Sequence, residues 1–139
     1  MVHIRDEGEF DAPVEKIWRF LNDEHAHNHS FNKLSKVIEE SDKGMTAEFD
    51  VKGPDGSWHK ETLKMDFNPP TGFTMEWLSG PIKGSKHTHT YTPMGNKTKV
   101  VVEGDFVAQG VDDATIRKNA LGRLELVFNE DTASLKSYK

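Results

Sequence analysis

Polar and apolar residues alternate one by one through the middle of the chain, and this period of two predicts β-strands. The clearest case is the segment in which Met45, Ala47, Phe49 and Val51 alternate with polar residues. A Gly-Pro-Asp-Gly sequence follows it, which is typical of a tight turn. Similar alternation between turn residues predicts seven strands in all, over residues 2–10, 37–41, 45–52, 57–67, 73–78, 87–92 and 97–108.

A helical period replaces the alternation directly after the first strand. Val14, Ile17, Trp18 and Leu21 follow one another at helical spacing and form a single apolar stripe. We expect Asp11 to cap this helix, because its carboxylate can accept hydrogen bonds from the free amides of the first turn. Trp18 is expected in the core.

A second helical stripe predicts a long C-terminal helix with a cap at Asp112 or Asp113 and an end near Lys136. Gly122 lies in its middle, and we interpret it as a tolerated defect that costs ~1 kcal/mol relative to alanine. The apolar positions of the stripe are Ile116, Ala120, Leu121, Leu124, Val127 or Phe128, and Leu135.

The order of these elements predicts one α+β domain over residues 1–139, with the C-terminal helix across one face of an antiparallel sheet. The sequence contains no internal repeat or linker that would divide it. It also contains no cysteine, which excludes disulfides, thiolate metal sites and cysteine nucleophiles.

Charge and hydropathy narrow the possible partners. The formal net charge is -5, and basic residues never form a run longer than two, so we expect no nucleic-acid binding. Residues 1–10 lack the apolar core of a signal peptide, and no stretch approaches ~18 apolar residues. We therefore expect a soluble cytoplasmic protein without stable membrane insertion, either a monomer or a homodimer.

Two segments resemble a known family. Residues 10–21, Phe-Asp-Ala-Pro-Val-Glu-Lys-Ile-Trp-Arg-Phe-Leu, resemble the opening of the polyketide cyclase/dehydrase and lipid-transport superfamily, which includes START-like and birch-pollen-allergen-like proteins. Residues 91–100, Tyr-Thr-Pro-Met-Gly-Asn-Lys-Thr-Lys-Val, are similar to its late hairpin. The resemblance implies a helix-grip fold: a curved seven-stranded antiparallel sheet, two short N-terminal helices and a long C-terminal helix that together enclose a cavity. It also implies a carrier of lipids, polyketides or similar molecules, since only a minority of members are enzymes.

The parity of the strands predicts which side chains line such a cavity. Those that share a face with Phe49 would point inward, and His87, His89 and Tyr91 would orient the polar end of a ligand. The predicted ligand-binding residues are Phe49, Met65, Phe73, Met75, Trp77, His87, His89, Tyr91, Phe106, Leu124 and Phe128. Trp58 is predicted on the other face.

Four polar residues of the inner face are candidates for general acid–base catalysis: His59, Glu61, His87 and His89. The two-residue spacing places His87 and His89 on one side of a strand, about 7 Å apart at Cα. With His59 or Glu61 they could hold a metal ion, but we expect no metal and no cofactor. The alternatives are hydrogen bonding across the sheet and, for His59 and Glu61, exposure at a strand end.

Two further polar features need an explanation. His25, His27 and His29 lie in a polar segment, residues 22–32, for which we expect a solvated loop with one short helical turn. If the segment is helical, His25 and His29 share a face and could pair. Adventitious metal binding at the cavity mouth is the alternative to the solvated loop that we prefer. Asp6 lies on the inner side of the first strand, and we expect a bulge before Gly8 to turn it toward water.

Three functions follow from these observations. The preferred one is binding of a small hydrophobic or amphipathic molecule in an internal cavity, as a carrier or sensor. The second is an enzyme of the cyclase or dehydratase kind that uses the inner histidines and Glu61. The third is a stress-related interaction module that binds a partner through the outer face of the sheet or the cavity mouth.

Overall fold

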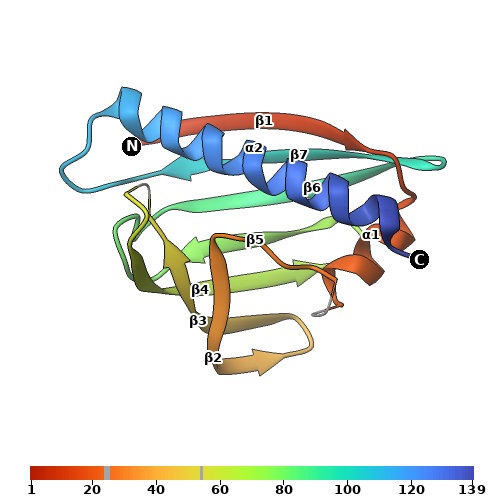
Figure 1. The fold of residues 1–139 in the computed structure, drawn as a ribbon, viewed down its shortest axis with the longest axis horizontal. Coiled ribbons are helices and arrows are strands. Elements are labelled where there is room, and N and C mark those ends of the chain that lie inside the picture. Colours follow the sequence, from red (N-terminus) through yellow and green to blue (C-terminus); the bar gives the residue numbers. More distant parts are fainter. Residues whose placement is uncertain (24–25, 54) are drawn as a thin grey trace.

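The computed structural model describes residues 1–23, 26–53 and 55–139. In these residues, seven antiparallel strands form one curved sheet and two helices accompany it (Figure 1). The elements are β1 (Val2–Phe10), α1 (Val14–Leu21), β2 (Asn32–Ser41), β3 (Gly44–Lys52), β4 (Trp58–Asn68), β5 (Gly72–Trp77), β6 (Lys86–Met94), β7 (Lys97–Phe106) and α2 (Asp113–Ser137).

The strands lie in the order β1-β7-β6-β5-β4-β3-β2, so β1 and β2 are the two edges. Helix α2 runs across the sheet over β1 and β7 (Figure 1), and Arg123 on α2 also reaches the end of β3 at Lys52. The predicted α+β arrangement and the number of strands are therefore confirmed. No helix in the described part of the chain is long and apolar enough to cross a bilayer.

Helix α2 begins where the sequence predicts. Asp112 is its N-cap, and its carboxylate accepts a hydrogen bond from the Thr115 amide at 3.2 Å. Ile116 and Leu135 are buried on the predicted stripe. Gly122 has open space around its Cα, which confirms that it is a tolerated defect rather than a point of close contact.

The N-terminal helices differ from the prediction. Only one short helix, α1, forms in the described residues, and the segment after it contains a turn in which the amides of Ala26 and His27 bond to the Asp23 carbonyl. This polar segment offers no apolar stripe that packing could stabilise as a helix. Asp11 is not the cap either: Pro13 stands at the N-cap position, without a side-chain capping bond.

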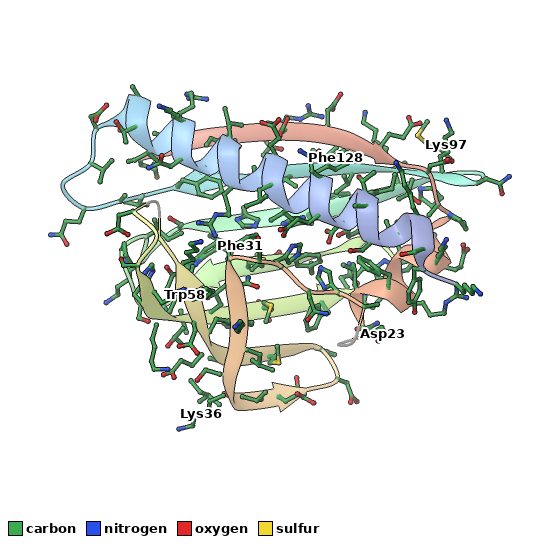
Figure 2. The ribbon with its side chains drawn as sticks, viewed as in Figure 1. Asp23, Phe31, Lys36, Trp58, Lys97 and Phe128 are labelled. Carbon is green, nitrogen blue, oxygen red and sulfur yellow. The ribbon has the colours of Figure 1, made fainter. Side chains whose placement is uncertain are left out.

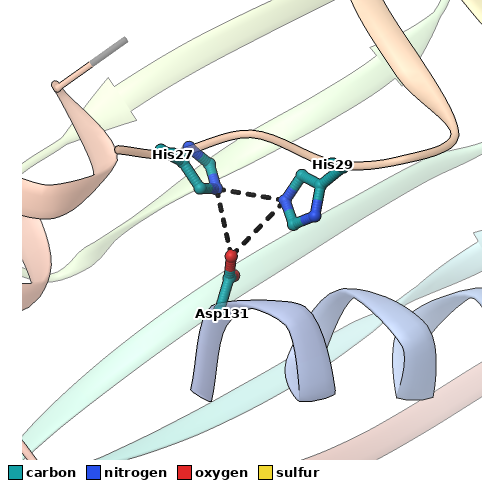
Figure 3. Close-up of side chains that lie close together, drawn as sticks. All are labelled: His27, His29 and Asp131. Atoms are coloured by element: carbon teal, nitrogen blue, oxygen red, sulfur yellow. Dashed lines mark hydrogen bonds and ion pairs between the residues drawn. The ribbon is translucent and has the colours of Figure 1, made fainter. Parts of the chain in front are cut away.

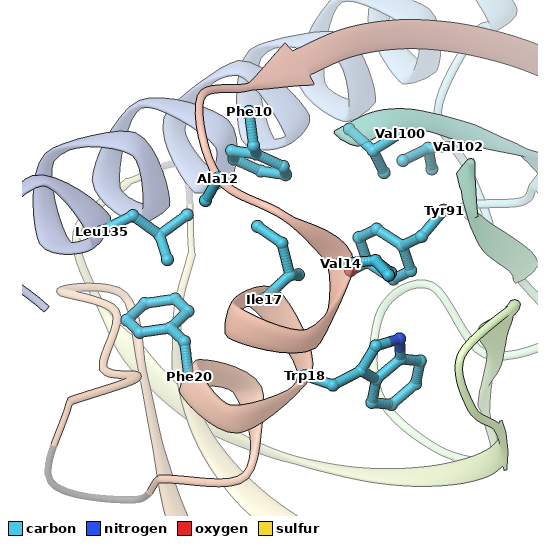
Figure 4. Close-up of a cluster of buried hydrophobic side chains, with 10 residues drawn as sticks. All are labelled: Phe10, Ala12, Val14, Ile17, Trp18, Phe20, Tyr91, Val100, Val102 and Leu135. Atoms are coloured by element: carbon cyan, nitrogen blue, oxygen red, sulfur yellow. The ribbon is translucent and has the colours of Figure 1, made fainter. Parts of the chain in front are cut away.

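The main hydrophobic core lies between α1, the end of α2 and strands β1, β6 and β7 (Figure 4). Trp18 is buried there, as predicted, and its indole donates to the Pro70 carbonyl at 2.9 Å. The buried members are Phe10, Ala12, Val14, Ile17, Trp18, Phe20, Tyr91, Val100, Val102 and Leu135. A second cluster, Val2, Ile4, Phe106 and Ile116, packs the start of α2 on the other end of β1.

The register of the sheet confirms the predicted inner face. Phe49 pairs with Glu61, Met75 pairs with His87, and Phe73 pairs with His89. Because directly opposite residues share a face, these side chains all lie on the concave side. Trp58 is exposed near the β2 edge, with the Lys33 ammonium 5.6 Å from its ring centre (Figure 2).

Two strand predictions are wrong. Strand β2 starts at Asn32, well before the predicted start at residue 37, because β3 supplies hydrogen-bonding partners along its length despite two register shifts. Strand β1 has no bulge: it pairs regularly with β7 from Val2 to Phe10. Asp6 thus keeps its inward direction, opposite Val102, and is nevertheless exposed.

Candidate functional site

A hollow of about 370 Å³ lies between helix α2 and strands β1 and β7. Its walls are mostly apolar, and two exposed acidic residues that line it, Asp6 and Glu125, form what we call the acidic rim. The full lining is Asp6, Glu7, Gly8, Val100, Val102, Leu121, Leu124, Glu125 and Phe128. Asp6 points toward the inner face of the sheet and is still exposed, because it lies at the mouth of this solvent-accessible hollow. A closed cavity stays a prediction.

The acidic rim keeps uncompensated negative charge. Glu7 also lines the hollow, but its side chain points to the outer face of β1, where it pairs with Arg5 at 2.9 Å and with Lys99 at 3.6 Å, and these cations lower the pKa of its carboxyl. Asp6 accepts a hydrogen bond from the Glu7 amide, but no ion pair of Asp6 or Glu125 occurs among the described residues. The mouth of the hollow is therefore suited to a polar group that is cationic or donates hydrogen bonds.

A chain of polar and aromatic contacts crosses the concave face. The carboxylate of Glu61 is buried, accepts a hydrogen bond from the Trp77 indole at 2.7 Å and is bonded to Nε2 of His59 through its other oxygen. The Trp77 ring lies 5.1 Å from the ring of His87. The sequence left open that both His59 and Glu61 are exposed at a strand end. In the structure His59 is partly exposed, whereas Glu61 is buried.

His87 and His89 meet directly. Their Nε2 atoms lie 3.0 Å apart, and the rings stack on Phe106 and Phe73 respectively. Burial lowers the pKa of His87 to about 4. Burial, helped by the neighbouring His87, also lowers the pKa of His89 well below its usual value. Both imidazoles are therefore neutral near pH 7, which suits hydrogen bonding to an uncharged group better than proton donation.

The remaining predicted lining residues divide into two groups. Tyr91 is buried against Trp18, with ring centres 5.8 Å apart, and burial raises the pKa of its hydroxyl. Met65 and Phe106 are buried as well. In contrast, Phe49, Phe73, Met75 and Trp77 on the inner face of the sheet and Leu124 and Phe128 on α2 are only half-buried, and of these six Leu124 and Phe128 line the hollow.

Comparison with known proteins gives the family. The model for "Polyketide cyclase / dehydrase and lipid transport" matches residues 1–137. The chain belongs to this family. No curated protein sequence matches it.

Solved structures show the same fold as this family member. A START superfamily protein from Mycobacterium smegmatis superposes with a TM-score of 0.83 at 14% identity, over 99% of each chain. The aromatase/cyclase Zhui from Streptomyces sp. R1128 has a TM-score of 0.75 at 16% identity, over 96% of this chain and 90% of that one. A protein from Thermus thermophilus has a TM-score of 0.78 at 13% identity, over 98% of each chain. At these identities the likeness concerns the fold.

One cluster in this family member was missed by the sequence prediction. Nε2 of His27, Nε2 of His29 and Oδ1 of Asp131 form a triangle, with His27 and His29 3.1 Å apart and Asp131 at 3.4 and 3.5 Å from them (Figure 3). Asp131 is buried on α2, and the side chain of His29, in the segment before β2, is only 9% exposed. The expectation of a solvated loop is thus wrong for His27 and His29. His25, the other residue of the predicted pair, lies outside the described residues.

A sequence signal for Asp131 exists. It occupies a position of the apolar stripe of α2, three residues after Phe128 and four before Leu135, where a carboxylate is out of place unless it has a partner. The sequence does not show which loop supplies that partner.

Arg123 fastens the same segment to α2 at a second point. Its guanidinium carbon lies 4.1 Å from the ring centre of buried Phe31, and it donates a hydrogen bond to the Lys52 carbonyl at 2.9 Å. Burial lowers the pKa of Arg123, while the nearby charges of Glu61 and Glu130 act in the opposite direction. The segment before β2 therefore closes one side of the space between α2 and the sheet.

Proposed function

We propose that this protein binds a small amphipathic organic molecule between α2 and the sheet. The observation that carries the proposal is the hollow of about 370 Å³ with apolar walls and an acidic rim. Pockets for small organic ligands span roughly 300–1,000 Å³ and are mostly apolar with a few polar groups. Membership of a family described by cyclisation, dehydration and lipid transport is consistent with such a ligand.

The polar groups of the site suggest the chemistry of the ligand. The acidic rim favours a cationic or hydrogen-bond-donating end at the mouth and disfavours a free carboxylate. His87 and His89 lie on the concave face outside the lining of the hollow, and their neutral imidazoles suit a hydroxyl or carbonyl group of a ligand that extends beyond it. The apolar lining of the hollow, Val100, Val102, Leu121, Leu124 and Phe128, would then cover the apolar body of the ligand.

Binding is tested with a panel of fluorescent amphiphiles that share one apolar body and carry a cationic, neutral or anionic end. Wild-type protein is expected to bind the cationic and neutral probes, and the anionic probe more weakly at low salt. Leu124→Trp fills the hollow and should weaken binding at least tenfold. Leu126→Trp is the matched control, because Leu126 is exposed on the same helix and does not line the hollow.

Either of two results contradicts this proposal. One is a wild-type protein that binds none of the probes and is not thermally stabilised by them. The other is binding that Leu124→Trp leaves unchanged. Circular dichroism and the melting temperature of each variant establish that it is folded.

The His59–Glu61 pair favours a second candidate function, acid–base catalysis on a bound carbonyl compound. A partly exposed imidazole bonded to a buried carboxylate is an arrangement that can take up and return a proton. The description of the family, which names cyclases and dehydrases, is consistent with this candidate.

Catalysis is tested by hydrogen–deuterium exchange at the carbon next to the carbonyl of a ketone probe in D₂O. A catalytic pair would remove the proton from that carbon, and a deuteron from solvent would replace it. Glu61→Gln and His59→Gln should each abolish any exchange above the buffer rate, while His3→Gln, on the exposed β1 surface, should not change it. Exchange at the buffer rate with wild-type protein excludes this function for the probe class.

A further inference from the structure

We propose that His27, His29 and Asp131 form a binding site for one transition-metal dication of the zinc type. These three residues, here called the histidine–aspartate triangle, lie where the segment before β2 meets α2 (Figure 3). The site is separate from the hollow and from the His59–Glu61 pair, and the inference does not depend on the proposed ligand binding.

The dimensions of the triangle match those of a metal site. Zinc in proteins lies about 2.0–2.1 Å from imidazole nitrogen and carboxylate oxygen, so two ligands of a tetrahedral ion are ~3.3–3.4 Å apart. The three edges observed are 3.1, 3.4 and 3.5 Å. An ion equidistant from the three atoms at that bond length would lie ~0.7 Å out of their plane, as tetrahedral geometry requires.

The charges around the triangle also favour a cation at its centre. Asp131 is buried, and within the described part of the chain its ion pairs are with His27 and His29, not with a lysine or arginine. Nδ1 of His29 lies 2.8 Å from the carboxylate of Glu130, to which it donates. In a neutral ring, Nε2 then carries the lone pair and faces the Asp131 oxygen. Two acceptor atoms, Nε2 of His29 and Oδ1 of Asp131, then face each other without a proton between them, and a bound metal ion would be coordinated by both.

A second layer of contacts fixes the orientation of the ligands. Metal-binding histidines usually donate their other ring nitrogen to a carboxylate, as His29 does to Glu130. Ser30 holds that carboxylate in turn, with its hydroxyl donating at 2.6 Å. His27 is positioned by its ring contact with Phe20 at 5.1 Å. The His29 ring is therefore presented to the centre of the triangle before any ion arrives.

The ligand set indicates the kind of metal and the consequence of binding. Two imidazoles with one carboxylate suit Zn²⁺, Co²⁺ or Ni²⁺ better than Mg²⁺ or Ca²⁺, which prefer oxygen ligands. Three protein ligands leave the fourth position of a tetrahedral ion open for water or another small ligand. Because two ligands come from the segment before β2 and the third from α2, bound metal would also fasten that segment to the helix.

The experiment is titration of the purified protein with Zn²⁺ by calorimetry and with Co²⁺ by visible absorption. We expect one equivalent of each metal to bind, with the intense d–d bands of four-coordinate cobalt. His27→Gln, His29→Gln and Asp131→Asn should each weaken Zn²⁺ binding more than tenfold. Glu130→Gln, which alters only the outer contact, should weaken it by about 10–100-fold.

His3→Gln is the matched control. His3 also lies between two carboxylates, Glu103 and Asp105, but it reaches them through opposite ring nitrogens and cannot join both in chelating one ion. Its replacement should leave the affinity unchanged. A measurement on wild-type protein avoids dependence on folding of the variants: Zn²⁺ should shift the ring Cε1–H NMR signals of His27 and His29 before those of other histidines.

Three outcomes overturn the proposal. The first is a wild-type protein that binds no Zn²⁺ at 100-fold excess over protein, together with unshifted ring signals. The second is an affinity that a folded Asp131→Asn variant retains. The third is binding that is lost in His87→Gln instead, which would assign the metal to the other histidine pair. None of these results affects the test of ligand binding with Leu124→Trp, because the hollow and the histidine–aspartate triangle share no residue.

Discussion

The Phe128 ring on α2 fills the space that a side chain at Gly8 on β1 would need, at the edge of the hollow. A Cβ placed on Gly8 would lie 2.6 Å from Cε2 of that ring. Phe128 also packs against Phe10 in a tilted arrangement, with ring centres 4.8 Å apart. The absence of a side chain at residue 8 therefore decides how closely α2 approaches β1 and how wide the hollow is.

Gly8→Ala should push the Phe128 ring toward the hollow and reduce its volume. We expect the variant to lose about 1 kcal/mol of unfolding free energy, because the displaced atom is the far end of a side chain and can move. Its affinity for the neutral probe should fall several-fold. Urea unfolding and fluorescence titration measure the two effects, and unchanged affinity would show that the ligand does not occupy this end.

Gly104 and Gly122 should respond in opposite ways to alanine. A Cβ on Gly104 would lie 2.2 Å from the Lys86 carbonyl oxygen, so Gly104→Ala must open the β6–β7 ladder and should cost about 3 kcal/mol. Gly122 has free space in mid-helix. Gly122→Ala should stabilise the protein by ~1 kcal/mol and raise Tm by about 3–5 °C. A destabilised Gly122→Ala would mean that α2 has a contact at this position in solution.

Trp77→Phe should destabilise the protein far more than Trp58→Phe. The first removes the donor to the buried Glu61 carboxylate and should cost about 1.5–3 kcal/mol. The second changes an exposed ring and should cost less than ~0.5 kcal/mol. Urea unfolding at pH 7 compares the two, and equal costs would contradict the inward placement of Glu61.

His87 should make the protein less stable in acid. Its folded-state pKa of about 4 lies below the ordinary 6.5, so the unfolded chain binds the proton more readily between these values. Unfolding free energy is therefore lost as the pH falls from about 6.5 to 4, by about 3 kcal/mol for this group alone. His89 acts in the same direction. His87→Phe should flatten this part of the pH profile, and an NMR titration midpoint near 6.5 for His87 would refute the prediction.

His3 should titrate in the opposite direction. Hydrogen bonds from its ring to Glu103 and then Asp105 stabilise the imidazolium and raise its pKa above 6.5. The same NMR titration should find His3 protonated at higher pH than an unperturbed histidine. Because the site is exposed, salt should reduce the shift. Glu103→Gln should lower the midpoint, and an unchanged value would show that the ion pair is not maintained in solution.

The local pattern of the chain predicted most of the secondary structure. Strand parity placed Phe49, Glu61, His87 and His89 on one face, because side chains alternate strictly along a strand and neighbouring strands share that alternation. The long C-terminal helix and its cap at Asp112 are equally local properties. The strand predictions failed at Asp6 and at the start of β2, where pairing with a neighbouring strand outweighs local preference.

The sequence by itself thus determined the fold class, the inner face of the sheet and the candidates His59, Glu61, His87 and His89. Only the tertiary structure decided that His27 and His29 meet Asp131. Glu130, which bonds to His29, lies 101 residues after it in the sequence, and Asp131 is the next residue, so no local pattern connects them. It likewise decided where the hollow lies. Periodicity reports which way a side chain points, whereas the distance between a helix and a sheet depends on how side chains such as Phe128 pack against positions such as Gly8.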